Sequence, residues 1–255
     1  MVRDTLLIFR AELAVSLRNK AFIVIGMMQP VLYLVLFGPL MEKLAASTPG
    51  FGPGKTWMVL TPGLIVQIAL LNASFAGYSI LTDQNAGVLE RLRVTPSSRA
   101  ALMLGKVLTI VVSTLFQAVL LIVIASLLFD VSAPAVGIVV CLVIAALLSL
   151  TLATLSNSIA LRMNNETAFS AVLNVLLLPI VLLSGILLPI TPQFAPTWLF
   201  VLSRLNPLSY VVDISRASFT GDLPPVGVAL GALMLFGIAA LAVWWGARTF
   251  QRETR

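Results

Sequence analysis

The sequence contains no histidine and only one cysteine, Cys141. A single cysteine cannot close a disulfide within the chain, and a metal site of the His/Cys type has no set of ligands. Cys141 lies in an apolar run, where a cysteine usually packs as a small hydrophobic residue. The long apolar runs also hold no pair of carboxylates for acid–base catalysis. We therefore expect a chain that binds no metal or cofactor and is not itself an enzyme.

Charged residues are scarce as well, at 10% of 255 residues, whereas hydrophobic residues make up 59%. Soluble domains contain about 25% charged residues and about 45–50% apolar ones. So much apolar surface cannot be enclosed in one water-soluble core and must face lipid. The net charge of +6 would also suit nucleic acid. The basic residues, however, lie in short gaps between apolar segments, which favours anchoring at a membrane surface and no nucleic-acid partner.

Six long uncharged runs separate the charged residues. A helix needs roughly 20 apolar residues to cross the hydrocarbon core, and a backbone in lipid must satisfy its own hydrogen bonds. Each run is long enough, so the sequence predicts an all-α membrane protein with six transmembrane helices. The runs are residues 21–41, 56–82, 107–129, 131–161, 167–203 and 223–247.

We expect one transmembrane domain over residues 1–255. Residues 1–20 mix basic and apolar side chains, which indicates a helix lying at the membrane interface; the alternative is a helix that merely extends the first span. Three prolines interrupt the part after span five, which predicts two short helices on the outer side. The predicted order is an interfacial helix (1–20), spans one to five (21–190), external half-helices (191–222), span six (223–247) and a tail (248–255).

The lysines and arginines set the orientation. Twelve lie in the N-terminal segment, the loops after spans two and four, and the C-terminal tail, whereas four lie on the opposite side. Cytoplasmic segments carry the excess of these residues. Both termini are therefore predicted to lie in the cytoplasm.

The chain holds no convincing nucleotide site. Residues 50–56 (GFGPGKT) resemble a phosphate-binding loop, but Pro49 stands where the pattern requires its first glycine. The polar groups at the span centres are amides and hydroxyls, without the buried ionisable groups that ion-driven transporters use. The energy source for transport is thus expected outside this chain.

Amide side chains at the span centres are the candidate lining of a substrate pathway. The alternative for each is a hydrogen bond that joins neighbouring helices. The six amides are Gln29, Gln67, Asn72, Gln117, Asn157 and Asn174, of which Gln29, Gln67, Asn72 and Asn174 are our pathway candidates.

The loop of residues 83–106 (DQNAGVLERLRVTPSSRAALMLGK) is charged and predicted to be cytoplasmic. Val88, Leu89 and Leu92 share one face of a short helix. Such a helix can dock in a groove of a soluble partner, and the alternative is a solvated loop.

This loop resembles the cytoplasmic loop of ABC-2 type permeases through Gly87–Pro96 (GVLERLRVTP), Ser98–Arg99 and Gly105–Lys106. A second stretch, Leu183–Pro189 (LSGILLP), followed by Pro196, Trp198 and Asn206–Tyr210 (NPLSY), is similar to the fifth span and outer helices of that family. The daunorubicin-resistance permease group is the most similar subgroup. The order of the two stretches and the six spans match throughout.

The resemblance implies a bacterial inner-membrane permease. It would pair with a second copy or a paralogue and bind two separate subunits that hold ATP and Mg. A coupling helix would contact the ATPase, and the substrate path would run between the permeases along the first, second and fifth spans. The coupling residues it implies are Gly87, Val88, Leu89, Glu90, Arg91, Leu92, Thr95 and Pro96.

The spans contain few aromatic residues, which favours an apolar or amphipathic substrate such as a drug, an antibiotic or a lipid-like compound. Export of a lipid-linked glycan or cell-envelope lipid is the alternative within the family. A membrane assembly factor or membrane enzyme is the alternative of a different class.

Overall fold

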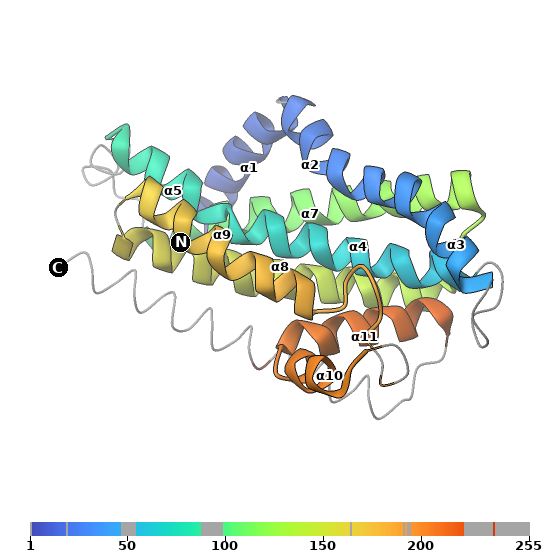
Figure 1. The fold of residues 1–255 in the computed structure, drawn as a ribbon. Coiled ribbons are helices and arrows are strands. Elements are labelled where there is room, and N and C mark those ends of the chain that lie inside the picture. Colours follow the sequence, from blue (N-terminus) through green and yellow to red (C-terminus); the bar gives the residue numbers. More distant parts are fainter. Residues whose placement is uncertain are drawn as a thin grey trace.

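The computed structural model describes residues 2–18, 20–46, 55–87, 99–163, 165–190, 192, 195–221 and 237. In these ranges the regular structure is helical throughout, and no strand is present (Figure 1). The prediction of an all-α protein is confirmed for this part of the chain. The helices are α1 (Val2–Arg18), α2 (Lys20–Leu32), η1 (Tyr33–Phe37), α3 (Gly38–Ala46), α4 (Lys55–Ser74), α5 (Ala76–Asn85), α7 (Arg99–Phe129), α8 (Ala135–Met163), α9 (Glu166–Leu183), α10 (Thr197–Arg204) and α11 (Pro207–Thr220).

Five helical segments within the described ranges are long and apolar enough to cross a membrane. They correspond to the first five predicted spans. The predicted sixth span and tail fall outside the described residues, apart from Gly237, so a six-span protein stays a prediction. The five segments are Val24–Lys43, Thr56–Asn85, Ala101–Phe129, Ala135–Met163 and Glu166–Leu183.

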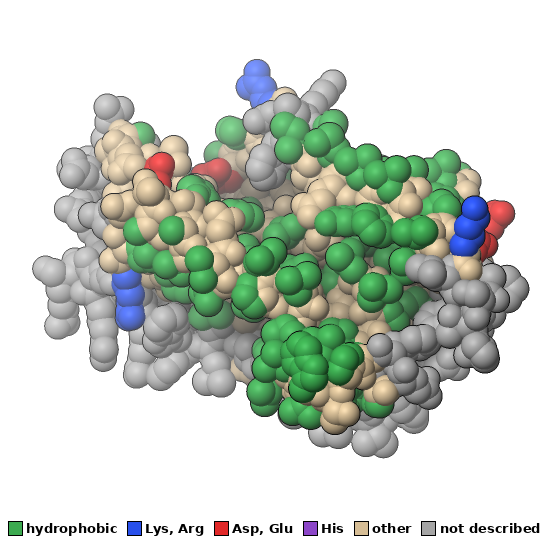
Figure 2. All heavy atoms as spheres, in the orientation of Figure 1, with side chains coloured by type: hydrophobic (Ala, Val, Ile, Leu, Met, Phe, Trp, Pro, Cys, Tyr) green, Lys and Arg blue, Asp and Glu red, His purple; other side chains and the backbone are tan. Residues whose placement is uncertain are grey.

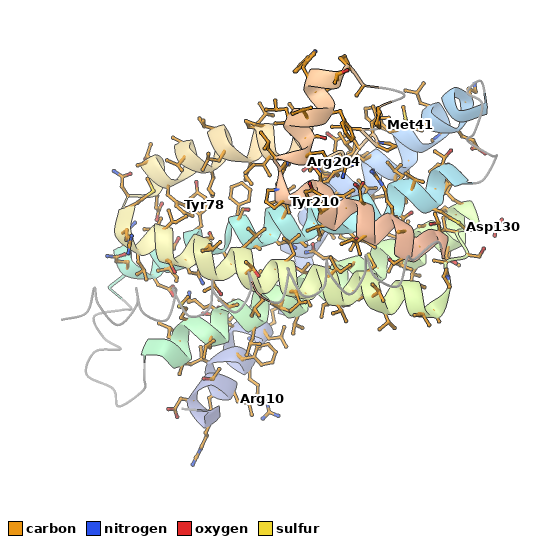
Figure 3. All side chains as sticks on the ribbon, turned by 90° about the horizontal axis from the view of Figure 1, so that it is seen from below. Arg10, Met41, Tyr78, Asp130, Arg204 and Tyr210 are labelled. Carbon is orange, nitrogen blue, oxygen red and sulfur yellow. The ribbon has the colours of Figure 1, made fainter. Side chains whose placement is uncertain are left out.

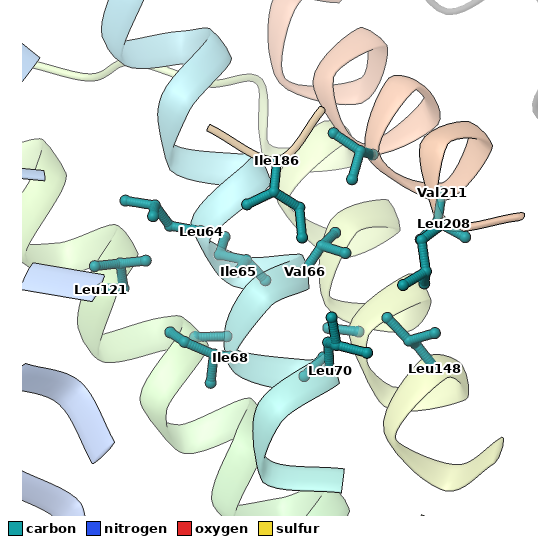
Figure 4. Packing of buried hydrophobic residues seen from close by; sticks show 14 of the residues in the cluster. Leu64, Ile65, Val66, Ile68, Leu70, Leu121, Leu148, Ile186, Leu208 and Val211 are labelled. Atoms are coloured by element: carbon teal, nitrogen blue, oxygen red, sulfur yellow. The ribbon is translucent and has the colours of Figure 1, made fainter. Parts of the chain in front are cut away.

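Helix α4 forms the centre of the bundle. It packs against α7 and α8, against α11 near its start, and against the first span. Every residue from 60 to 70 is buried, and Leu64 and Ile65 are fully enclosed. Figure 4 shows α4 side chains meeting Leu121, Leu148, Ile186 and the first turns of α11. Protein neighbours therefore surround the middle of α4, whereas the other spans leave apolar side chains exposed.

The first span is one continuous helix with a wider turn inside it. It runs through α2, η1 and α3, and η1 is a π-helix of 5 residues that begins three residues after Pro30. Single π turns inside α-helices occur frequently at functional sites. Further along, Gly38 lies so close to Trp57 that a Cβ there would stand 1.8 Å from the ring atom Cζ3. Trp57 in turn stacks on Phe129, with ring centroids 3.7 Å apart.

The fifth span, α9, ends before residue 190, where the sequence analysis placed the end of spans one to five. It begins where the Asn165 side chain accepts a hydrogen bond from the backbone N–H of Ala168. It ends at Leu183, because Gly185 adopts a left-handed conformation with φ of 71°. The two short helices expected after it are α10 and α11. Pro207 occupies the first turn of α11, and Asn206 caps it by accepting from the N–H of Leu208.

The surface carries many large apolar side chains. In Figure 2 hydrophobic side chains cover much of the visible face, and the visible charged side chains lie towards its edges. Val24 and Leu36 in the first span are 64% exposed, and Val175 in α9 is 72% exposed. An apolar surface on this scale is what a lipid-facing helix presents.

Candidate functional site

Gly87 marks the start of the candidate coupling loop. Its N–H donates to the carbonyl of Gln84, and the N–H of Ala86 donates to that of Thr82, which closes α5. Gly87 has a φ of 69°, the left-handed conformation in which helices commonly end at glycine. The next described residue is Arg99 at the start of α7. The other coupling candidates, from Val88 to Pro96, therefore fall outside the described residues, and their role stays a prediction.

A buried lysine lies beside the two ends of this loop. Lys106 of α7 is 5% exposed. Its Nζ forms an ion pair with Asp83 of α5 and lies 3.5 Å from Oε1 of Glu12 in α1. It also donates to the carbonyl oxygen and the hydroxyl of Ser79, at 3.3 and 3.4 Å. These four residues, the Lys106 cluster, join α1, α5 and α7.

Helix α1 is held against α7 by apolar contacts beside this cluster. A Cβ at Gly105 would stand 2.7 Å from Cγ2 of Ile8 and 3.2 Å from the backbone nitrogen of Phe9. Only glycine allows so close an approach. Leu6 and Leu7 lie on the outward side and are more than half exposed. Figure 3 shows Arg10 pointing away from the bundle. The amphipathic helix is thus present, and its place at a membrane interface stays a prediction.

The four pathway candidates occupy different environments. Gln29 on α2 and Asn174 on α9 are exposed. Gln67 on α4 is 2% exposed, and its Oε1 has no hydrogen-bond partner among the described residues. Asn72, also on α4, is half-buried and donates from Nδ2 to Oε1 of Gln117 at 2.9 Å. Their role in a substrate pathway stays a prediction, and for Asn72 the structure adds a bond between two spans.

Gln117 of α7 lies against two other spans. Besides accepting from Asn72 of α4, it faces α2, where a Cβ on Gly26 would stand 3.2 Å from its Nε2. Within the part of the chain that the structure describes, that nitrogen has no hydrogen-bond partner, and neither amide atom of the fully buried Asn157 in α8 has one. Buried polar groups are usually hydrogen-bonded. Among the described residues, these buried amides are therefore exceptions to that rule.

A buried arginine anchors the helix pair that follows the fifth span. Arg216 of α11 is 7% exposed. Its Nη2 donates to the carbonyls of Gly185 and Ile186 at 2.7 and 2.9 Å, and its Nε donates to that of Val59 at 3.0 Å. Burial lowers the pKa of Arg216 to about 10, and the nearby carboxylate of Asp213 opposes this shift. The guanidinium is therefore charged at neutral pH and ties α11 to α4 and to the turn after α9.

Comparison with known proteins identifies the kind of membrane protein. Residues 3–220 match the protein family described as the ABC-2 type transporter. The chain belongs to this family. The match extends from α1 through α11, so the Lys106 cluster, Arg216 and all the coupling and pathway candidates lie within the ABC-2 region.

Known relatives of this ABC-2 chain are transport permeases. The transport permease ycf38 of Cyanophora paradoxa is 28% identical over 222 residues, which is 87% of this chain and 76% of the relative. That of Porphyra purpurea is 29% identical over 199 residues, 77% of this chain and 67% of the relative. That of Pyropia yezoensis is 32% identical over 209 residues, 78% of this chain and 68% of the relative. ABC-2 membership makes the chain a transport subunit.

Sequence reasoning missed the two buried cations of this ABC-2 chain as structural centres. In the sequence analysis Lys106 and Arg216 mattered only for the charge balance and the family resemblance. The one available signal was their spacing. Lys106 lies about two helical turns after the coupling loop, and Arg216 lies three residues after Asp213. In the structure Asp213 pairs with Arg204, at 2.8 Å.

Proposed function

We propose that the chain is the membrane-spanning subunit of an ATP-driven ABC exporter that moves an amphipathic drug, antibiotic or lipid-like compound out of the cell. Family membership supports a permease, and the apolar helices supply a membrane domain. The subgroup we favour is that of the daunorubicin-resistance permeases, because of the GVLERLRVTP and LSGILLP stretches. The location we favour is a bacterial cell membrane with both termini in the cytoplasm, on the lysine and arginine distribution.

The partners follow from what the chain lacks. Its ionisable residues lie near the ends of the five candidate spans, so ion coupling through the membrane centre has little support. ATP and Mg would be held by two separate ATP-binding subunits. A second copy or a paralogue of the permease would complete the path, with Gln29, Gln67, Asn72 and Asn174 as its candidate polar lining.

The observation that carries this proposal is the loop between α5 and α7. Its ends are fixed by the Gly87 turn and by the Lys106 cluster, and its sequence places Val88, Leu89 and Leu92 on one helical face. An apolar face on a cytoplasmic loop is suited to a groove in a soluble partner. We propose that these three side chains bury against the ATPase, each gaining about 1.5–3 kcal/mol by transfer before ordering costs.

The test places a charge on that face. Leu89→Asp and Leu92→Asp should each abolish co-purification of the ATP-binding subunit, or abolish ATP-driven uptake of daunorubicin into inside-out vesicles. Membrane insertion should be unchanged, because no span is altered. Ser98→Asp, beyond Pro96, is the matched control and should have a much smaller effect. Wild-type complex formation and transport in both leucine variants would show that this loop is not the coupling element.

A further inference from the structure

The burial of Lys106 is not explained by stability alone. Its side chain is 6% exposed, whereas the side chains of Asp83 and Glu12 are 28% and 36% exposed, so the ammonium is the innermost group of the cluster. An ammonium loses its hydration on burial, and its partners must replace it. Apolar residues of similar size often give at least equal stability in such places. What a buried ion pair can add is one defined arrangement of the elements that it joins.

The elements joined are those on either side of the coupling loop. Asp83 lies four residues before Gly87, and Lys106 lies in the second turn of α7, seven residues after Arg99. Their ion pair therefore fixes the separation of the loop's two ends. A displacement of residues 88–98 cannot open or shear that junction without breaking the pair, so both ends must move together.

Helix α1 is the third element held by the same ammonium. Glu12 faces Lys106, and Ile8 packs against Gly105, the residue before Lys106. Helix α5 is also separated from α4 by a break in the helix at Phe75. The joint lies between α5 and the central helix, whereas Met103 and Val107 near the start of α7 share a buried cluster with Ala73 of α4.

We propose that Lys106 is a positioning residue that makes α1, α5 and the start of α7 move as one unit when the ATPase displaces the coupling loop. This inference rests on the proposed function. Lys106 touches neither substrate nor ATP; it acts by holding the two carboxylates on one cation. Without the cation, Asp83 and Glu12 would repel each other, and α1 would no longer follow α5.

The main experiment measures the coupling of hydrolysis to transport in the complete complex. Permease and ATP-binding subunits are reconstituted together, and daunorubicin transported per ATP hydrolysed is compared among variants. Lys106→Met should still hydrolyse ATP but transport about tenfold less daunorubicin per ATP, a typical loss for removing a coupling interaction. Lys106→Arg keeps the charge and should restore most of the ratio. Lys43→Met, at an exposed lysine of α3, is the control and should match the wild type.

A fully neutral cluster separates a structural role from a positioning role. The triple variant Glu12→Gln/Asp83→Asn/Lys106→Met leaves no unpaired charge, so it should insert and melt like the wild type even if Lys106→Met alone does not fold. We expect it to remain uncoupled. Wild-type coupling in either Lys106→Met or the triple variant would overturn the proposal.

Hydrogen exchange of the isolated permease distinguishes failure of this inference from failure of the proposed function. Lys106→Met should speed exchange in α1 and α5 together, and Lys43→Met should not. If the wild-type complex moves no daunorubicin with ATP, the assigned transport function is wrong for that substrate class, and exchange still decides about the cluster. Unchanged exchange in α1 and α5 would overturn the role of Lys106 whatever the transport result.

Discussion

Replacing Arg216 should destabilise the permease more than replacing any exposed charge. The guanidinium donates to three backbone carbonyls, those of Val59, Gly185 and Ile186. In Arg216→Met these carbonyls lose their donor while they stay buried beneath α11. Hydrogen bonds to charged groups contribute about 1.5–3 kcal/mol each. Part of their loss is offset, because the methionine variant no longer pays the cost of burying a charge. We expect a net cost of about 3–5 kcal/mol, the usual range when one partner of a buried ionic contact is removed.

The assay is the thermal or SDS-induced unfolding of the purified permease, followed by tryptophan fluorescence or gel filtration. Arg204→Met is the matched control. Arg204 pairs with Asp213 at 2.8 Å with its side chain 34% exposed, and an exposed pair contributes less than about 1 kcal/mol. In Figure 3 Arg204 lies next to Tyr210. If Arg216→Met costs no more than Arg204→Met, the guanidinium does not hold the turn after α9 in place.

The pH dependence of the same measurement has a definite sign. Burial lowers the pKa of Arg216 to about 10, which is below its value in the unfolded chain. Below pH 10 the group is protonated in both states, so the cost of Arg216→Met should be the same at pH 6 and pH 8. Above the folded pKa the unfolded state binds more protons, so this group alone would make stability rise with pH.

Two further predictions concern the helix contacts around α4. Gly38→Ala should displace the ring of Trp57, lower the free energy of unfolding by about 1–3 kcal/mol and shift the tryptophan emission. In a Trp57→Leu background the same change should lower it much less. Equal losses in both backgrounds would contradict the contact. Asn72→Leu should lose the hydrogen bond to Gln117 and lower stability by about 0.6–2 kcal/mol. Gln29→Leu, at an exposed position, should leave stability unchanged. If Gln29 lines the path, this variant should lower daunorubicin transport. Unchanged transport in Gln29→Leu would remove that residue from the pathway.

The spans could be predicted from the sequence because lipid allows few backbone conformations. An uncharged run of sufficient length should contain a helix that spans the membrane, and each of the first five runs contains one long and apolar enough. The end of the fifth span could not be predicted from charge, because no charged residue marks it. It depends on the left-handed backbone at Gly185 and on the hydrogen bond from Arg216 to the carbonyl of that glycine. This bond joins parts of the chain that are distant in sequence.

The candidate site was only partly predictable for a related reason. Composition identified the amides within the spans but not their neighbours. The pairing of Asn72 with Gln117 requires the relative register of α4 and α7, which periodicity does not provide. Lys106 and Arg216 each entered the charge balance as one basic residue among sixteen. Both are buried and bind groups on neighbouring helices, which a count of charges cannot show.

Two breaks in the helices explain why polar side chains are buried beside them. An interruption in a membrane helix frees backbone groups that lipid cannot satisfy, so neighbouring side chains must bind them. At the break between α4 and α5, the hydroxyl of Ser156 donates to the carbonyl of Ser74 and accepts from the N–H of Gly77. At the break after α9, Arg216 has the equivalent task.

These two breaks lie beyond opposite ends of α4, since Arg216 contacts Val59 near its start and α5 follows its last residue, Ser74. The centre of α4 is enclosed on all sides, and its helix continues through Pro62 to Ser74. Packed interiors move as rigid bodies, whereas joints satisfied by a few exchangeable hydrogen bonds can change partners. If the proposed ATPase drives this permease, the segments beyond the two breaks should move around a fixed α4. In that scheme Lys106 joins α1 and α5 to the start of α7 at the coupling end. Arg216 holds α11 and the turn after α9 against α4 at the other end.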